Sequence, residues 1–209
     1  MNRISYTATN IITAVTALFW LVAQAVAPAD RVAVVLGFIP ARFSGLVHIA
    51  PAVPTFLTPL SATLAHASLW HIAFNLLMLV WCGAQVERVI GTFGFVLLYV
   101  VGAYASALAQ WAVAPDALTP MIGASGAISA VVGAFALSYG RAKAVTNNLR
   151  INRWINVAWL MAAWVVLQLM MGWLAGGQGY LLATPAHIGG FAAGLLLQRP
   201  LLLFHYRKA

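Results

Sequence analysis

Apolar residues in this chain run in long blocks, unlike the alternating or one-sided patterns of water-soluble strands and helices. No Asp, Glu, Lys or Arg occurs between Arg3 and Asp30, and similar apolar blocks follow along the rest of the chain. A block of about 20 apolar residues is long enough for a helix to cross the hydrocarbon core of a bilayer. The pattern therefore predicts an all-α membrane protein with several spanning helices.

Charged residues, Pro and Gly divide the apolar sequence into six expected transmembrane helices. Their approximate ranges are residues 11–27, 65–85, 93–113, 121–139, 154–174 and 184–204. Residues 31–64 interrupt the series because four prolines break any long helix there, while the segment stays apolar. We expect residues 31–64 to form an interfacial loop within a single membrane domain that covers residues 1–209.

Composition agrees with a membrane protein and excludes other classes. Of the 209 residues, 63% are hydrophobic and 7% are charged, whereas a soluble domain has roughly 25% charged residues. A chain with 8 Trp, 10 Phe and 6 Tyr in so apolar a context does not stay disordered in water. Its one cysteine, Cys82, lies inside an apolar block, which rules out a disulfide framework and a cysteine metal site. We expect no metal and no cofactor.

The formal net charge of +8 is explained by where the basic residues lie relative to the expected helices. With the N-terminus in the cytoplasm, nine Lys and Arg residues fall on the cytoplasmic side, and Arg31 and Arg42 fall outside. The positive-inside rule therefore predicts that both termini are cytoplasmic. Because membrane orientation accounts for the charge, we expect the lipid bilayer as a partner and no nucleic acid.

The first apolar block, residues 11–27, has a polar flank with Arg3, as a signal peptide would. The sequence Pro28-Ala-Asp30-Arg31 that follows is a poor cleavage site, so we interpret the block as a retained helix. No long targeting extension precedes it. We therefore expect a multi-pass protein of a bacterial inner membrane.

Two polar residues in the apolar blocks indicate chemistry. Ser125 lies in Gly123-Ala-Ser125-Gly126 near the outer end of the fourth helix, and His187 opens the sixth helix at the same expected depth. An ionisable group inside a span is costly and usually faces a cavity or a partner. Since an imidazole accepts a proton near neutral pH, it can activate a serine as a nucleophile. The two residues therefore form a candidate catalytic pair.

A catalytic triad would need a carboxylate behind the histidine. The three acids, Asp30, Glu87 and Asp116, all lie at expected water boundaries, so we predict a dyad. Other intramembrane protease mechanisms lack their residues, because no His-Glu-x-x-His run occurs and no two Asp are expected inside the membrane.

Helix packing is the alternative explanation of the serine segment. Small residues recur one turn apart at Gly126 and Ala130 on the fourth helix, and at Gly190 and Gly194 on the sixth. Such faces let two helices approach closely. The same contact would bring the histidine to the serine, so the two explanations are compatible.

The second helix adds His71 and Asn75, which share one face because they are four residues apart. An imidazole and an amide can donate hydrogen bonds to a developing negative charge, as in an oxyanion hole. We expect Gly123, two residues before the serine, to belong to the same group. Interhelical hydrogen bonding is the alternative use of His71 and Asn75. His66 is expected to point elsewhere and to anchor a loop.

These segments together resemble the rhomboid family of intramembrane serine proteases, over the second to sixth helices. The resemblance rests on the serine segment, on His187 with its two glycines, on His71 with Asn75, and on Glu87-Arg88-Val-Ile-Gly91. It implies a six-helix bundle with a water-filled cavity open to the outer side. It also implies cleavage of transmembrane protein substrates near the outer membrane face.

The chain departs from the family pattern in two places. Arg42-Phe43 stands where several members have a Trp-Arg pair, and Ser129 stands where members often have an aromatic packed on the catalytic histidine. We expect a more hydrated and less firmly oriented imidazole as a result. We also expect the fifth helix to tilt as a gate at the glycine-rich residues 176–179.

Two other functions remain open from the sequence. A non-proteolytic rhomboid-like binder or chaperone of membrane proteins would keep the fold without cutting, and a small-solute transporter would also place His and Asn inside the membrane. The joint presence of Ser125, His187, His71 and Asn75 favours the protease.

Overall fold

The computed structural model describes residues 7–139, 145–174 and 183–207. Within these residues the chain is helical, and its one extended pairing is an isolated bridge between Phe38 and Met121. The longer elements are α1 (Thr7–Val26), α5 (Leu69–Met78), α6 (Ala84–Val113), α7 (Ser125–Tyr139), α8 (Leu149–Leu174) and α9 (Thr184–His205). The short elements are α2 (Ala29–Leu36), α3 (Pro40–Phe43), η1 (Thr55–Leu57), α4 (Thr58–Ser61), η2 (Ala62–Leu64) and η3 (Leu79–Gly83), the last a π-helix.

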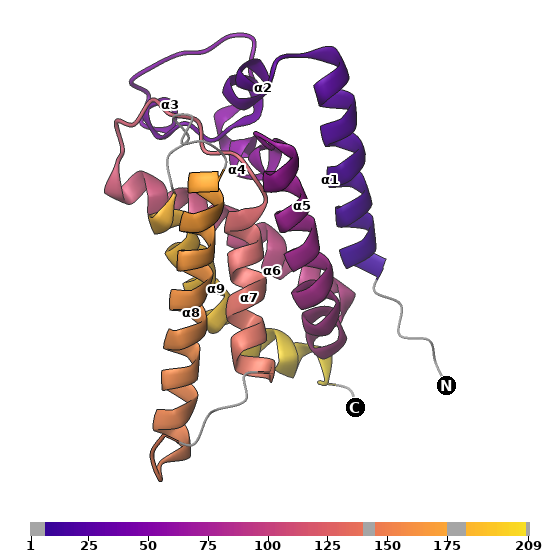
Figure 1. The fold of residues 1–209 in the computed structure, drawn as a ribbon, viewed down its shortest axis with the longest axis vertical. Coiled ribbons are helices and arrows are strands. Elements are labelled where there is room, and N and C mark those ends of the chain that lie inside the picture. Colours follow the sequence, from indigo (N-terminus) through magenta and orange to yellow (C-terminus); the bar gives the residue numbers. More distant parts are fainter. Residues whose placement is uncertain (1–6, 140–144, 175–182, 208–209) are drawn as a thin grey trace.

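The long helices lie side by side, with α1 and α8 on opposite sides and α2 and α3 gathered at one end (Figure 1). Four segments of the described chain are long and apolar enough to cross a membrane. They are Thr7–Val26, Leu69–Val113, Leu149–Met170 and Thr184–His205. The six-span count and the cytoplasmic placement of both termini stay predictions.

The longest of these segments, 45 residues, doubles back on itself. Gly91 interrupts α6 with a φ of 73°, in the left-handed region that favours glycine. The ring of Phe95 then packs beside Gly83, twelve positions earlier in the sequence. The segment therefore consists of two antiparallel helical parts that meet at Gly91.

Two helices begin later than the apolar pattern predicts. α5 begins at Leu69 and not near residue 65, because Ser68 is its N-cap and its Oγ accepts a hydrogen bond from His71 N at 3.2 Å. α7 begins at Ser125 and not near residue 121, because Gly123, with a φ of 104°, ends the preceding turn. The predicted end of the third helix at residue 113 and the start of the sixth at residue 184 agree with the structure.

Residues 31–64 are more regular than the predicted loop. Their prolines do prevent a long helix, but the segment folds into a series of short helical turns. It contacts the turn in front of α7, since Gly123 N donates to Ala62 O at 2.8 Å. Within the segment, Ser61 Oγ donates to Leu36 O at 2.7 Å. Its position at the membrane interface stays a prediction.

Glu87 is buried between α1 and α6, and its expected depth at a water boundary stays a prediction. Its side chain is 3% exposed and accepts hydrogen bonds from Ala8 N at 3.0 Å and Thr9 N at 2.9 Å. The hydroxyls of Thr9 and Thr92 also donate to it, at 2.7 Å and 2.8 Å. Because a carboxylate satisfies the free N–H groups at a helix N-terminus, Glu87 caps α1 and fastens it to α6.

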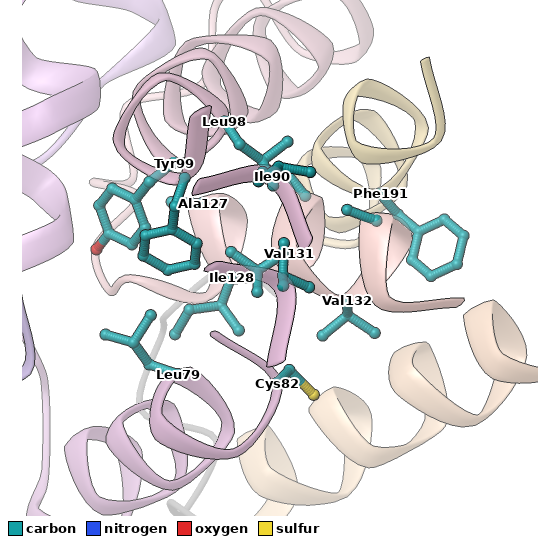
Figure 2. Packing of buried hydrophobic residues seen from close by; sticks show 14 of the residues in the cluster. Leu79, Cys82, Ile90, Leu98, Tyr99, Ala127, Ile128, Val131, Val132 and Phe191 are labelled. Atoms are coloured by element: carbon teal, nitrogen blue, oxygen red, sulfur yellow. The ribbon is translucent and has the colours of Figure 1, made fainter. Parts of the chain in front are cut away.

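The apolar core lies around α7, between α6 and α9 (Figure 2). Ten of the 15 residues of α7 are buried, and Leu98, Ile128 and Phe191 are fully enclosed. A helix that is apolar all round packs in the centre of a bundle and not at its surface. The first turn of α7, which begins with Ser125, is therefore held by well-packed neighbours.

Several residues used in the sequence predictions lie outside the described part of the chain. These are the expected glycine hinge at residues 176–179 and four basic residues of the orientation argument, Arg3, Arg141, Lys143 and Lys208.

Candidate active site

Ser125 and His187 lie within hydrogen-bonding distance of each other. Ser125 is the first residue of α7, and His187 lies in the first turn of α9. The distance from Ser125 Oγ to His187 Nε2 is 2.9 Å, and the two residues are 8% and 6% exposed. This is the separation at which an imidazole can take the proton of a serine hydroxyl.

Glycines allow this approach of α7 and α9. A Cβ built on Gly190 would fall on the carbonyl oxygen of Gly126, and one built on Gly194 would fall on the carbonyl oxygen of Ala130. Any larger side chain at these glycines would push the two backbones apart. The close helix packing and the serine–histidine pair are therefore one and the same contact.

His71 packs against the glycine turn that enters α7. A Cβ on Gly123 would lie 2.7 Å from His71 Cε1, so only glycine fits beside this imidazole. Gly123 also needs its left-handed backbone, which glycine adopts without strain. The imidazole of His71 thus packs against a residue that lies two positions before Ser125.

Asn75 is fully buried on the same helix as His71. Its Nδ2 donates to His71 O at 2.9 Å, and its buried Oδ1 has no hydrogen-bond partner. Because a primary amide nitrogen carries two hydrogens, this bond leaves one of them for another acceptor. The part of Asn75, His71 and Gly123 in stabilising an oxyanion stays a prediction.

His66 lies against His71, so the prediction that it points elsewhere is wrong. The two ring centroids are 4.9 Å apart, and His66 is 3% exposed. Its Nε2 accepts from Ala124 N at 3.4 Å, while its Nδ1 lies 3.3 Å from Leu64 O. Burial, and then the neighbouring His71, lower the pKa of His66 to about 3, so the ring is neutral. His66 anchors the residue just before the nucleophile candidate.

The three acids lie apart from the histidine. Asp30 and Asp116 are exposed, and the Glu87 carboxylate is bonded to the N-terminus of α1. Among the described residues, no group of three or more His, Cys, Asp and Glu side chains could hold a metal ion. The groups available for chemistry at this site are therefore hydroxyl, imidazole and amide.

Ser129 is buried and bonded, which contradicts the expected hydrated space beside the imidazole. It is fully enclosed, its Oγ donates to Ser125 O at 2.7 Å, and it accepts from Trp164 Nε1 at 2.8 Å. His187 itself is 6% exposed. The position of Ser129, one turn after Ser125, is a sequence signal for contact with the serine. Trp164 lies in an apolar block, and nothing in the sequence marks it as a partner of Ser129.

Sequence reasoning also missed two polar residues on α6. Ser106 is fully buried and Gln110 is 4% exposed, one turn further along the same face. A Cβ on Gly126 would lie 2.7 Å from the Cβ of Ser106, so Ser106 packs directly beside the serine segment. Their four-residue spacing inside an apolar helix is the signal that could have found them.

Comparison with known proteins shows the family of this chain. A family model described as the Rhomboid domain matches residues 53–204, which include both Ser125 and His187. The chain belongs to the rhomboid family. RHOMBOID-like protein 4 of Arabidopsis thaliana is 29% identical over 146 residues, 69% of this chain and 34% of that protein. This rhomboid therefore spans about a third of the length of that relative. With its long apolar helices, it is a multi-pass integral membrane protein.

Proposed function

We propose that this rhomboid is an intramembrane serine endopeptidase that cleaves transmembrane protein substrates near the outer membrane face. The observation that carries the proposal is the 2.9 Å distance between Ser125 Oγ and His187 Nε2 inside a tightly packed bundle. Membership of the rhomboid family supports the same activity. The sequence resemblance supports it further, because it assigns the nucleophile and the base to these two residues.

In the proposed reaction, His187 takes the proton of Ser125 while the serine oxygen attacks the carbonyl carbon of a substrate peptide bond. Hydrogen bonds from His71, Asn75 and the backbone near Gly123 stabilise the negative charge that develops on the carbonyl oxygen. His187 then gives its proton to the nitrogen of the leaving amine, and an acyl-serine ester remains. Water attacks this ester with the same imidazole as base, which releases the second product and restores Ser125.

The proposed topology puts this chemistry near the outer surface of the bilayer. With six spans and both termini in the cytoplasm, α7 and α9 begin at the outer side, and Ser125 and His187 lie in their first turns. A substrate helix must unwind before its peptide bond can be attacked, and an unwound backbone in a membrane needs polar groups around it. We propose a bacterial inner membrane as the location.

The test begins with a fluorophosphonate, a reagent that phosphonylates activated serines. The detergent-solubilised wild type, Ser125→Ala, His187→Ala and Ser138→Ala are treated in parallel, and the intact mass of each is measured. Ser138 is the matched control, because it lies on the same helix and its Oγ donates to Ala134 O at 2.9 Å, away from the histidine. We expect one adduct on the wild type and on Ser138→Ala, and none on the other two.

A second assay uses the same proteins in lipid vesicles with a single-span test substrate. We expect cleavage by the wild type and by Ser138→Ala alone. A folded wild type that neither reacts with the fluorophosphonate nor cuts the substrate would contradict the proposal. It would instead favour the non-proteolytic binder.

A further inference from the structure

α8 makes little contact with the rest of the bundle. In its membrane-spanning window 17% of the residues are buried, against 33% in α9. The buried residues in the part of α8 whose side chains the structure describes are Asn152, Val157, Trp164 and Gln168. Any specific contact between this part of α8 and the candidate site must therefore come from very few side chains.

Trp164 makes such a contact, through a chain of two buried hydrogen bonds. Its Nε1 donates to Ser129 Oγ at 2.8 Å, and Ser129 Oγ donates to Ser125 O at 2.7 Å. The direction of both bonds is fixed, because an indole nitrogen only donates and a hydroxyl has a single proton to pass on. Trp164 is 3% exposed and Ser129 is fully enclosed, so water does not compete with either bond.

The indole ring is also held on the side of α5. The rings of Trp164 and Phe74 stack with centroids 5.9 Å apart and an interplanar angle of 24°. Phe74 directly precedes Asn75, the candidate oxyanion donor. Trp164 thus joins α8 both to the turn that carries the nucleophile candidate and to the helix that carries the amide.

We infer that Trp164 is a positioning residue for Ser125, acting through the hydroxyl of Ser129. The inference rests on the proposed function. The indole N–H holds the Ser129 hydroxyl in the orientation that binds the carbonyl oxygen of Ser125. That bond fixes the first turn of α7 and so the direction from which Ser125 Oγ faces His187. The serine is correctly aligned while α8 is seated against α7.

Two variants remove the two ends of the contact. Trp164→Phe keeps an aromatic ring against Phe74 but loses the N–H, and Ser129→Ala loses the acceptor. Replacement of Trp164 by 3-benzothienylalanine is a sharper variant, because this residue has nearly the volume of tryptophan with sulfur in place of the N–H. Trp159→Phe is the matched control, since Trp159 lies on the same helix but is 67% exposed.

The readouts are the rate of fluorophosphonate labelling at saturation and kcat and KM for a transmembrane test substrate. We expect each of the three variants to lower the labelling rate and kcat about fivefold, with KM within about twofold of wild type. The double variant Trp164→Phe with Ser129→Ala should lose no more than either single variant, because both act on one chain of bonds. Trp159→Phe should behave as wild type.

A wild-type labelling rate in the 3-benzothienylalanine protein would overturn the inference. So would a change in KM alone, or additive losses in the double variant. In each case a labelled wild type would leave the proposed function intact. An unlabelled and inactive wild type would overturn both. A purely structural role of Trp164 predicts a lower unfolding temperature with an unchanged labelling rate, and this too would overturn the inference.

Discussion

The α7–α9 contact and the α7–α8 contact hold helices together by opposite means. Between α7 and α9, glycines bring backbone against backbone, and no side chain can adjust to a small displacement. Between α7 and α8, the contact near the candidate site depends on one indole and one hydroxyl. The serine and the histidine both lie on the tightly packed α7–α9 pair, whereas α8 is linked to the serine by the bond from Trp164 to Ser129.

Because the two contacts differ, variants in them should separate effects on stability from effects on reactivity. A change in the glycine contact should affect both, because it moves the two reacting groups and the core together. A change in a single polar contact should affect stability if that contact fastens a helix, and reactivity if it positions a reacting group. Four variants test this division.

The largest effect is expected from Gly194→Val, which breaks the rigid contact. A Cβ there already falls on the backbone of Ala130, so α7 and α9 must move apart. We expect a loss of about 3 kcal/mol in unfolding free energy and no detectable fluorophosphonate labelling. Thermal unfolding and intact mass measure the two effects. The control is Leu196→Ala, because Leu196 lies on the same helix and is 75% exposed. A stable, labelled Gly194→Val protein would refute the role of the glycine contact.

Asn75→Ala tests the chemistry without moving the helices. If its amide stabilises the oxyanion, its loss should lower kcat by about 10²- to 10³-fold, which corresponds to about 3 to 4 kcal/mol in the barrier. Substrate cleavage in vesicles measures this. Leu77→Ala is the control, because Leu77 lies on the same helix and is 62% exposed. Activity within threefold of wild type would show that the Asn75 amide serves only its bond to His71 O.

His66→Gln tests the anchor in front of α7 through the dependence of stability on pH. The pKa of His66 is lowered to about 3 in the folded protein, whereas an unfolded histidine titrates near 6.5. The unfolded state therefore binds more protons as the pH falls below about 6.5, so the contribution of His66 to stability decreases toward acid. Between pH 7 and pH 5 the wild type should lose about 2 kcal/mol more than His66→Gln. Parallel losses in chemical denaturation would argue against a buried neutral ring.

Glu87→Gln has the smallest expected effect. It is the counterpart of Trp164→Phe, because each variant weakens one polar contact of a sparsely buried helix. α1, like α8, has 17% of its window buried and is fastened by a polar side chain. Loss of the charge should cost about 1 to 2 kcal/mol in unfolding free energy, because the hydrogen bonds from α1 weaken. The labelling rate of the folded protein should not change, since Glu87 is bonded to α1 and not to the serine. A slower rate at unchanged stability would remove the contrast between the two contacts.

Much of the fold and of the candidate site follows from the sequence where the signal is local. The start of α9 and the end of α6 agree with the predictions made from the limits of the apolar blocks. The pairing of Ser125 with His187 was predicted from equal depth and from small residues on both helices, which are properties of each segment alone.

The misses involve contacts between distant segments. Glu87 stands at the end of an apolar block, and nothing in its neighbourhood reveals that its partners are Ala8 and Thr9, 79 and 78 positions away. The bond of Ser129 to Trp164 joins residues 35 positions apart. The predicted direction of the His66 side chain is wrong for a local reason. Helical spacing does not apply to His66, because it precedes the N-cap of α5.

The burial of Cys82 has a practical consequence for measuring helix positions. It is the only thiol of the chain, 3% exposed within the core around η3. Thiol-directed spin labels and fluorophores therefore meet no accessible native site in the folded protein. A cysteine pair placed on the exposed sides of α8 and α9 can report the spacing of these helices by electron paramagnetic resonance, with the wild type as an unlabelled background.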